Sequence, residues 1–302
     1  MRKRNAVRAA AAALAATMVL TACGGGGGNE TTAAAGGDTG SAAAGGDAAA
    51  SGSGEVGKTD ITFAMGADIV TLDPAGQQDT TTSVIIKHVY STLLDISDEG
   101  ELVPDLAESY ELVNDTDFVF KLREDAVWSD GTPVTANDVK FTFDRAKNMP
   151  KTKSNTSKVK EVVVDNEHQV TIKLTEPYAP FKSIVANSNL SIVQEAAVTA
   201  AGEAYGDADN AVGSGPFTVK EWVPNDHYTL EKNANYWGEE PITTSITCRV
   251  IPEGSARAIA LETGEVDLVW NVDPTDCSNI EANSDVKLLS QPSSSIEYLG
   301  MN

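Results

Sequence analysis

The sequence has few residues of the kinds that build metal sites. Only three of its 302 residues are histidine and only three are cysteine. The histidines, His88, His168 and His227, fall in a helical pattern, a turn and a predicted hairpin, and no two of them stand at metal-ligand spacing. We therefore expect no metal site built by this chain and no cofactor.

Cysteine is scarce as well. Beyond Cys23 there are only Cys248 and Cys277. Two cysteines of an exported protein could form a disulfide, but Cys248 lies in a strand pattern and could equally be a small buried core residue. The sequence leaves both interpretations open.

Basic residues are outnumbered by acidic ones. The chain carries 22 lysines and arginines against 44 aspartates and glutamates, a formal net charge of −22. This balance disfavours nucleic acid and anionic lipid surfaces as partners. We interpret it as a solvated acidic surface that aids solubility.

Two catalytic patterns are incomplete or out of context. Ser214 lies between two glycines, but a nucleophile elbow would need glycine in place of Val212 and Pro216. Residues 52–59 match the phosphate-loop pattern G-x-x-x-x-G-K-[ST], yet low-complexity sequence precedes them and an apolar strand pattern at 61–65 follows, where this chemistry needs a helix. An enzyme such as an exported hydrolase or an ATPase is therefore disfavoured.

The N-terminus is typical of an export signal with a lipid attachment site. Four basic residues lie within the first eight positions, and the apolar stretch at 9–20 is too short to cross a bilayer. The stretch ends in Leu-Thr-Ala-Cys, a lipobox in which Cys23 would receive a diacylglyceryl group. A plain secretory signal with an incidental cysteine is the alternative. We predict a lipoprotein signal peptide at 1–22 and a lipid anchor on Cys23.

A tether is predicted to follow the anchor. Residues 23–58 are mostly Gly, Ala, Ser and Thr with a few acids, a composition that cannot bury a core and that favours a disordered coil. We expect this segment to connect the membrane to a folded part that begins near residue 59.

From residue 59 onward the pattern is mixed α and β without internal repeats. Thr135 and Asp138 predict a helix start with a capping box, and Gly131 and Gly264 predict turns or helix ends with left-handed backbone. The aromatic residues Trp128, Phe118 and Phe120 are predicted to be core. Strands are predicted at 61–65, 108–113, 118–122, 162–164, 170–174, 246–251 and 266–272, with a further hairpin near 217–230. Helices are predicted at 82–94, after Thr135, at 180–186, 194–204 and 255–263, and from 274–276.

Seven motifs in a fixed order carry a family resemblance. The most specific is GSGPFTVKEWVPNDHYTLEKNANYW at 213–237, which resembles the G-[TS]-G-P-[FY]…W…L…N-x-x-Y-W segment of bacterial extracellular solute-binding proteins of dipeptide, oligopeptide and nickel ABC transporters. The others are TLDPA at 71–75, LVPDLAESY at 102–110, FVFKLR at 118–123, WSDGTPVTANDV at 128–139, LETGEVD at 261–267 and YLGMN at 298–302. Each motif alone is weak evidence, but the seven in this order are strong evidence, and the resemblance covers about residues 60–302.

The resemblance implies an α/β, periplasmic-binding-protein-like two-lobe fold, of which this chain would hold the first lobe with its extra subdomain and only the start of the second lobe. It places the first lobe at 59–96 plus 189–270, an inserted subdomain at 97–188, and a hinge crossing at 271–302. Relatives of this family continue beyond the last motif, so we expect the chain to be a fragment of a longer parent.

The resemblance also implies the function. A membrane-anchored, non-enzymatic and monomeric binding protein would capture short peptides on the outer face of the cytoplasmic membrane, facing the periplasm if the cell has an outer membrane. It would deliver them to the permease subunits of an ABC transporter, after two lobes close over the ligand. Nickel-chelate, haem or oligosaccharide binding on the same scaffold stays open.

Mapped onto this sequence, the resemblance places the ligand between three segments. They are the loop after the L-D-P motif, the end of the strand near 266–270, and the strand near the last residues. Each polar residue that these segments offer as a ligand contact could equally be an ordinary loop or strand residue, and Trp270 could be a core residue. The candidate ligand-binding residues are Gln78, Thr80, Thr81, Trp270, Asn271, Ser293, Ser294 and Ser295.

A substitution at the lipobox tests the predicted anchor. Cys23→Ala removes the thiol that would carry the lipid, so the protein should move from the membrane fraction to the medium or periplasm. Fractionation followed by immunoblotting measures this, and unchanged membrane association of the variant would show that the lipoprotein prediction is wrong.

Overall fold

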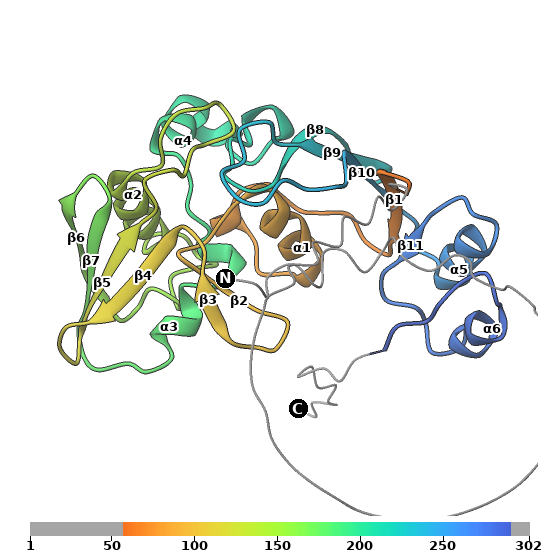
Figure 1. Cartoon of the computed structure of the whole chain (residues 1–302), viewed down its shortest axis with the longest axis horizontal. Coiled ribbons are helices and arrows are strands. Elements are labelled where there is room, and N and C mark those ends of the chain that lie inside the picture. Colours follow the sequence, from red (N-terminus) through yellow and green to blue (C-terminus); the bar gives the residue numbers. More distant parts are fainter. Residues whose placement is uncertain (1–56, 291–302) are drawn as a thin grey trace, which may run out of the picture. The chain divides into compact units, whose positions relative to one another are not determined.

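A computed structural model of the chain describes residues 57–290, and those from Lys58 onward belong to one compact unit. They form a five-stranded sheet, a four-stranded sheet and a two-stranded ribbon, joined by helices (Figure 1). The strands are β1 (Asp60–Met65), β2 (Leu94–Ile96), β3 (Leu102–Pro104), β4 (Ala107–Leu112), β5 (Asp117–Leu122), β6 (Val159–Asn166), β7 (Gln169–Leu174), β8 (Phe217–Val223), β9 (His227–Lys232), β10 (Ser245–Val250) and β11 (Leu268–Val269). The α-helices are α1 (Thr80–Val89), α2 (Ala136–Ala146), α3 (Phe181–Ile184), α4 (Glu195–Ala201), α5 (Gly254–Glu262) and α6 (Cys277–Ala282), and the 3-10 turns are η1 (Pro74–Gly76), η2 (Ser188–Leu190), η3 (Gly202–Ala204) and η4 (Ala208–Asn210).

The five-stranded sheet has the carboxyl ends of three strands on the same side. Its order is β11-β1-β10-β9-β8, and β1 pairs in parallel with both β10 and β11. The connection from β10 to β11 runs through α5, because parallel strands need a crossover where antiparallel ones need only a turn. The chain therefore leaves β1, β10 and β11 at Gly66, Ile251 and Trp270 on the same side of the sheet. Open α/β sheets hold their ligands at this side.

The four-stranded sheet is built from two hairpins that the sequence predicts. Its order is β4-β5-β7-β6, antiparallel throughout, and the side chains of Phe118, Phe120 and Leu122 on β5 are buried. Helix α2 packs against β6 and β7. The predicted capping box is confirmed, since the carboxylate of Asp138 accepts a hydrogen bond from the backbone N–H of Thr135 at 3.0 Å. The core positions predicted for this sheet are confirmed with it.

Predicted turns are confirmed where glycine takes left-handed backbone. Gly131 has φ 84° and Gly264 has φ 73°, a region that other residues rarely adopt. Trp128, before the first of these turns, is fully buried as predicted. Strand β1 follows Thr59, so the phosphate-loop pattern is not followed by the helix that it requires. Residues 52–56 of that pattern lie outside the described part.

Four predicted elements are shorter than their sequence patterns. The helix predicted over 82–94 ends at Val89, because Tyr90 takes extended backbone and its N–H closes the helix on the carbonyl of Ile86 at 2.8 Å. The apolar residues Leu93 and Leu94, which continue the pattern, pack in the core of the four-stranded sheet instead.

Two of the other three shortened elements end at backbone that regular structure does not allow. The strand predicted over 266–272 is reduced to β11, and Asn271 takes a left-handed φ of 58° just beyond it. The helix predicted over 194–204 stops at Ala201, since Gly202 has φ 56° and a 3-10 turn follows. The helix predicted over 180–186 spans only Phe181–Ile184.

The two later cysteines are not paired with each other. Cys248 is completely buried and Cys277 is half-buried, and both are free thiols in the part of the chain that the structure describes. Burial raises the pKa of the Cys248 thiol to about 12, which makes it a small core residue and not a reactive thiol. Of the two interpretations left open by the sequence, the structure supports the buried core residue. Within residues 57–290, no helix has the length and apolar character needed to cross a bilayer.

A buried ion pair joins the segment after β1 to α2. The guanidinium of Arg145 donates to both carboxylate oxygens of Asp73, at 2.8 and 2.6 Å, and only 5% of Asp73 is exposed. The same guanidinium lies over the ring of Tyr205, 5.4 Å from its centroid, and the Tyr205 hydroxyl donates to that of Tyr90 at 3.4 Å. Burial is the largest single influence and lowers the pKa of Arg145, but hydrogen bonding to Asp73 and the negative charge of that carboxylate together raise the pKa above its ordinary value. This cluster fixes the start of the loop that carries Gln78.

Removing one partner of this pair should destabilise the protein strongly. Arg145→Met leaves a carboxylate buried without its cation, and we expect the free energy of unfolding in urea to fall by about 3–5 kcal/mol. The double variant Asp73→Leu with Arg145→Met removes both charges and should recover a large part of that loss. Lys121→Met, which removes the exposed partner of Glu108, serves as the control and should have little effect. Equal losses in the Arg145 and Lys121 variants would contradict the role of the buried pair.

Candidate functional site

The loop between β1 and α1 is held by two aspartate caps. Asp73 accepts the backbone N–H of Ala75 at 3.1 Å and so caps the short turn η1. Asp79 accepts the backbone N–H of Thr82 at 2.7 Å and caps α1. Between these caps the chain presents two neighbouring glutamines, Gln77 and Gln78. Their backbone is thereby fixed at both ends.

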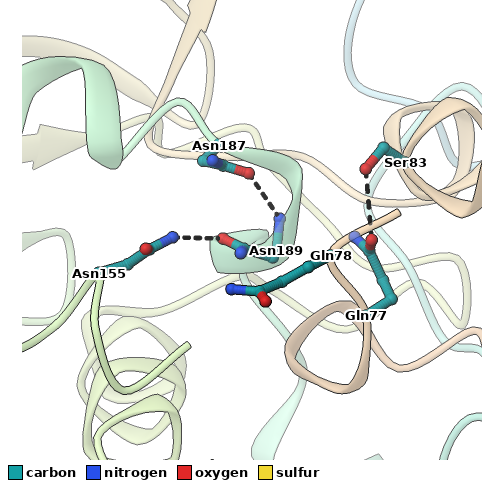
Figure 2. Close-up of a pocket in the computed structure, with 6 residues that line it drawn as sticks. All are labelled: Gln77, Gln78, Ser83, Asn155, Asn187 and Asn189. Atoms are coloured by element: carbon teal, nitrogen blue, oxygen red, sulfur yellow. Dashed lines mark hydrogen bonds between the residues drawn. The ribbon is translucent and has the colours of Figure 1, made fainter. Parts of the chain in front are cut away.

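These glutamines lie on one wall of a polar hollow of about 300 Å³, which we call the amide pocket (Figure 2). Its other walls come from α1, from the loop between α2 and β6, and from the residues around η2. Every side chain of the lining is polar and uncharged. The lining residues are Gln77, Gln78, Ser83, Asn155, Asn187 and Asn189.

Hydrogen bonds among the amides fix the walls of the pocket. The side-chain N–H of Asn155 donates to the side-chain oxygen of Asn189 at 3.1 Å, and that of Gln78 donates to the carbonyl of Lys151. The side-chain oxygen of Asn187 accepts the backbone N–H of Asn189 at 3.3 Å. In Figure 2, Asn155 and Gln77 approach from opposite sides with Asn189 between them. Segments that lie 34 residues apart in the sequence are thus joined here.

Gln77 has a polar group without a partner. Only 1% of this residue is exposed, and its side-chain oxygen accepts from the Ser83 hydroxyl at 3.3 Å. Its amide nitrogen, Nε2, is buried and has no hydrogen-bond partner among the described residues. A buried donor left unsatisfied lowers the stability of the fold by about 1–3 kcal/mol. This N–H is therefore a candidate hydrogen-bond donor to a ligand.

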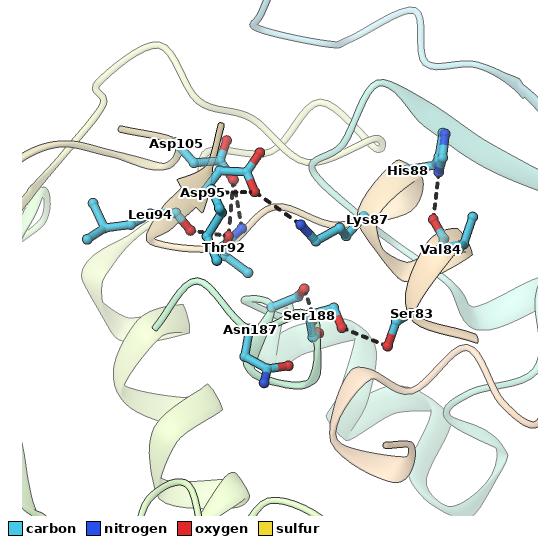
Figure 3. Close-up of polar contacts among 12 residues, drawn as sticks. Ser83, Val84, Lys87, His88, Thr92, Leu94, Asp95, Asp105, Asn187 and Ser188 are labelled. Carbon is cyan, nitrogen blue, oxygen red and sulfur yellow. Dashed lines mark hydrogen bonds and ion pairs between the residues drawn. The ribbon is translucent and has the colours of Figure 1, made fainter. Parts of the chain in front are cut away.

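Helix α1 is tied to the segments that face it (Figure 3). The Ser188 hydroxyl of η2 donates to the Ser83 hydroxyl at 3.0 Å, and Lys87 forms an ion pair with Asp95 at 3.3 Å. The single hydrogen of the Ser83 hydroxyl is shared between the carbonyl of Asp79, at 2.8 Å, and the Gln77 oxygen, which places Ser83 at the first turn of the helix. The pocket wall formed by Ser83 is therefore fixed from two sides.

A second group of candidate residues lies at the carboxyl end of β11. Trp270 is half-buried and packs against the core of the five-stranded sheet, and Asn271 is exposed. The Arg257 guanidinium donates to the carbonyl of Asn271 at 3.2 Å. It also donates to the carbonyls of Ile251 and Pro252, each at 2.9 Å. Arg257 thus joins the chain segments that leave β10 and β11.

The structure places the predicted site residues in two groups. Gln78 lines the amide pocket, and Thr80 and Thr81 follow it in the first turn of α1. Trp270 and Asn271 lie after β11, and within residues 57–290 no hydrogen bond or ion pair joins them to the first group. Ser293, Ser294 and Ser295 lie outside the described residues, as do Cys23 and the signal peptide.

The other residues of the amide pocket carry no recognisable sequence pattern. Asn155, Asn187 and Asn189 stand in polar stretches that resemble ordinary loops, and no motif connects them with Gln77. Their only sequence signal is the density of amides in Ala-Asn-Ser-Asn at 186–189. The pocket can bind a ligand through hydrogen bonds, but it offers no nucleophile paired with a base. No group of three or more potential metal ligands occurs among the described residues.

Comparisons with known proteins identify the family of the chain. The family model described as bacterial extracellular solute-binding proteins, family 5 Middle, matches residues 101–302. The glutathione-binding protein GsiB of Shigella dysenteriae is 30% identical over 248 residues, which are 80% of this chain and 48% of that protein. The chain thus spans about half the length of the curated relatives that it matches.

Solved structures share the fold. The ABC transporter-associated periplasmic binding protein DppA from Helicobacter pylori, in complex with the peptide STSA, superposes with a TM-score of 0.68 at 26% identity, over 74% of this chain and 49% of that one. MoaA from A. tumefaciens, in complex with mannopinic acid, gives 0.70 at 28% identity, over 75% and 48%. The α/β fold is of the periplasmic-binding-protein type, as predicted, and the chain belongs to the bacterial extracellular solute-binding proteins of family 5.

Proposed function

We propose that the intact protein captures short peptides outside the cytoplasm and delivers them to the permease subunits of an ABC transporter. The observation that carries this proposal is family membership together with the likeness to DppA, a relative that holds the peptide STSA. The glutathione-binding relative GsiB supports a small peptide as ligand. The protein would act by binding and release and not as an enzyme.

The proposed ligand site combines both groups of candidate residues. Gln78, Thr80 and Thr81 would contact the ligand from the loop before α1, and Trp270 and Asn271 from the carboxyl end of β11. Ser293, Ser294 and Ser295 would add a strand that pairs with the extended peptide backbone. The sheet supports this proposal, because three parallel strands end at the side where open α/β sheets hold ligands.

The proposed organisation follows the division expected from the sequence. Residues 59–96 plus 189–270 would form the first lobe, 97–188 an inserted subdomain, and 271–302 the crossing towards a second lobe. Ligand contacts with both lobes would favour the closed form, which the permease recognises. A lipid on Cys23 and the tether at 23–58 would hold this monomeric protein at the outer face of the cytoplasmic membrane.

A second candidate ligand is a small organic acid, because MoaA, which is 28% identical, was solved with mannopinic acid. Nickel chelates, haem and oligosaccharides are further ligand classes for the same scaffold. The identity of the ligand that co-purifies with the protein distinguishes these ligand classes from short peptides. Mass spectrometry of material released by denaturing the freshly purified, full-length protein would name its class.

Peptide binding and the placement of Trp270 can be tested together. We expect calorimetry to detect short peptides binding to the full-length protein, and Trp270→Ala to lower their affinity at least about tenfold, the equivalent of 1.4 kcal/mol. Tyr110→Ala is the control, since Tyr110 is a partly exposed aromatic residue on β4. Binding of mannopinic acid and no peptide would contradict the proposed ligand class. Equal affinity of both variants would contradict the proposed site at Trp270.

A further inference from the structure

We propose that the amide pocket is a specificity pocket for one uncharged hydrogen-bonding group of the ligand, such as a carboxamide or a hydroxyl side chain. This inference rests on the proposed function, because it names the chemistry that a captured peptide would present there. It adds Gln77, Asn155 and Asn189 to the residues that contact ligand.

The lining disfavours a charged group. All six residues of the pocket wall are amides or a hydroxyl, and the carboxylate of Asp79, which follows Gln78 in the chain, already accepts the N–H of Thr82. A cation or an anion that entered would lose water without meeting an opposite charge, which is costly for any ion. Amides offer both donors and acceptors, so they suit neutral polar groups instead.

The lining also disfavours an apolar group. The Nε2 nitrogen of Gln77 is buried and lacks a partner within residues 57–290, and a methyl or isobutyl group would leave it so while removing water from the other amides. A carbonyl or hydroxyl oxygen would accept its N–H. Sites built to hydrogen-bond a substrate reject analogues that lack the bonding group, because buried polar atoms are then left unpaired.

The pocket is already arranged before a ligand arrives. Ser83 is bonded to the first turn of α1 and to Ser188, and the Asn155 amide is bonded to that of Asn189. The loop that carries Gln77 follows the buried pair of Asp73 and Arg145. Fixed side chains lose little conformational entropy on binding, so a matching group gains most of the hydrogen-bond energy.

The size of the pocket fits one side chain and not a whole peptide. Its volume of about 300 Å³ is at the lower end of the range for small-molecule sites. The exposed residues Gln78 and Asn187 border it, so it is open to solvent and to the rest of the ligand. One residue of a bound peptide could enter while the backbone remains outside.

A peptide panel tests the inference on the full-length protein. Tetra-alanine is varied one position at a time to glutamine, serine, leucine, lysine or glutamate, and each affinity is measured by calorimetry. At one position we expect glutamine or serine to bind about tenfold more tightly than the other three. Asn155→Ala and Asn189→Ala should abolish this preference, and Asn148→Ala, an exposed amide on the loop after α2, should preserve it.

The outcomes separate the two proposals. Peptides that bind with no preference for glutamine or serine at any position would overturn the inference and leave the proposed function standing. If no peptide of the panel binds, the proposed function fails and the inference fails with it. A preference that survives in both the Asn155 and the Asn189 variants would also overturn the inference, because another site must then supply it.

A second measurement needs no ligand. Gln77→Met keeps the length of the side chain and removes the unpaired donor, so the melting temperature of the free protein should rise by about 2–4 °C while the preference for glutamine or serine is lost. A fall in the melting temperature would show that the Gln77 amide stabilises the fold, and would contradict its assignment as a free ligand contact.

Discussion

The buried ion pair between Asp73 and Arg145 is the interaction on which the position of the candidate site depends. Both charges are removed from most of their water, and a two-point hydrogen bond together with the cap at Ala75 offsets that loss. Because the chain runs from Asp73 directly through η1 to Gln77, a displaced loop would separate the pair and leave a charge buried alone. The loop is therefore held against α2, and the amide pocket is formed there.

The two sheets contribute different parts of the candidate site. The five-stranded sheet sets the ends of β1, β10 and β11 on one side, and Arg257 holds the segments that leave two of them. The four-stranded sheet carries α2 and the loop after it, which bring Arg145 to Asp73 and Asn155 to the wall of the amide pocket. Groups from both sheets thus meet around Gln77, where neither sheet alone would form a pocket.

Local signals in the sequence predicted much of the fold, and contacts over long sequence distances were missed. The hairpins, the capping box at Thr135 and the turns at Gly131 and Gly264 depend on a few adjacent residues, so they could be found. The early end of α1 could not, because Leu93 and Leu94 continue its apolar pattern while belonging to another core. Whether Cys248 forms a disulfide or is a buried core residue depends on packing, which the spacing of the cysteines in the sequence does not reveal.

The candidate site could be predicted only where a motif passes through it. Gln78 follows the L-D-P motif closely and was therefore named as a candidate, whereas Asn155 and Asn189 are single amides in polar loops that come together only when the chain folds. The central claim is that such amides select an uncharged polar group of a captured ligand. A crystal structure of the full-length protein with its co-purified ligand tests this most directly. We predict a carboxamide or hydroxyl of the ligand about 2.7–3.2 Å from Gln77, Asn155 or Asn189. A bound ligand that leaves the amide pocket to water, or places a charged or apolar group in it, would contradict the account.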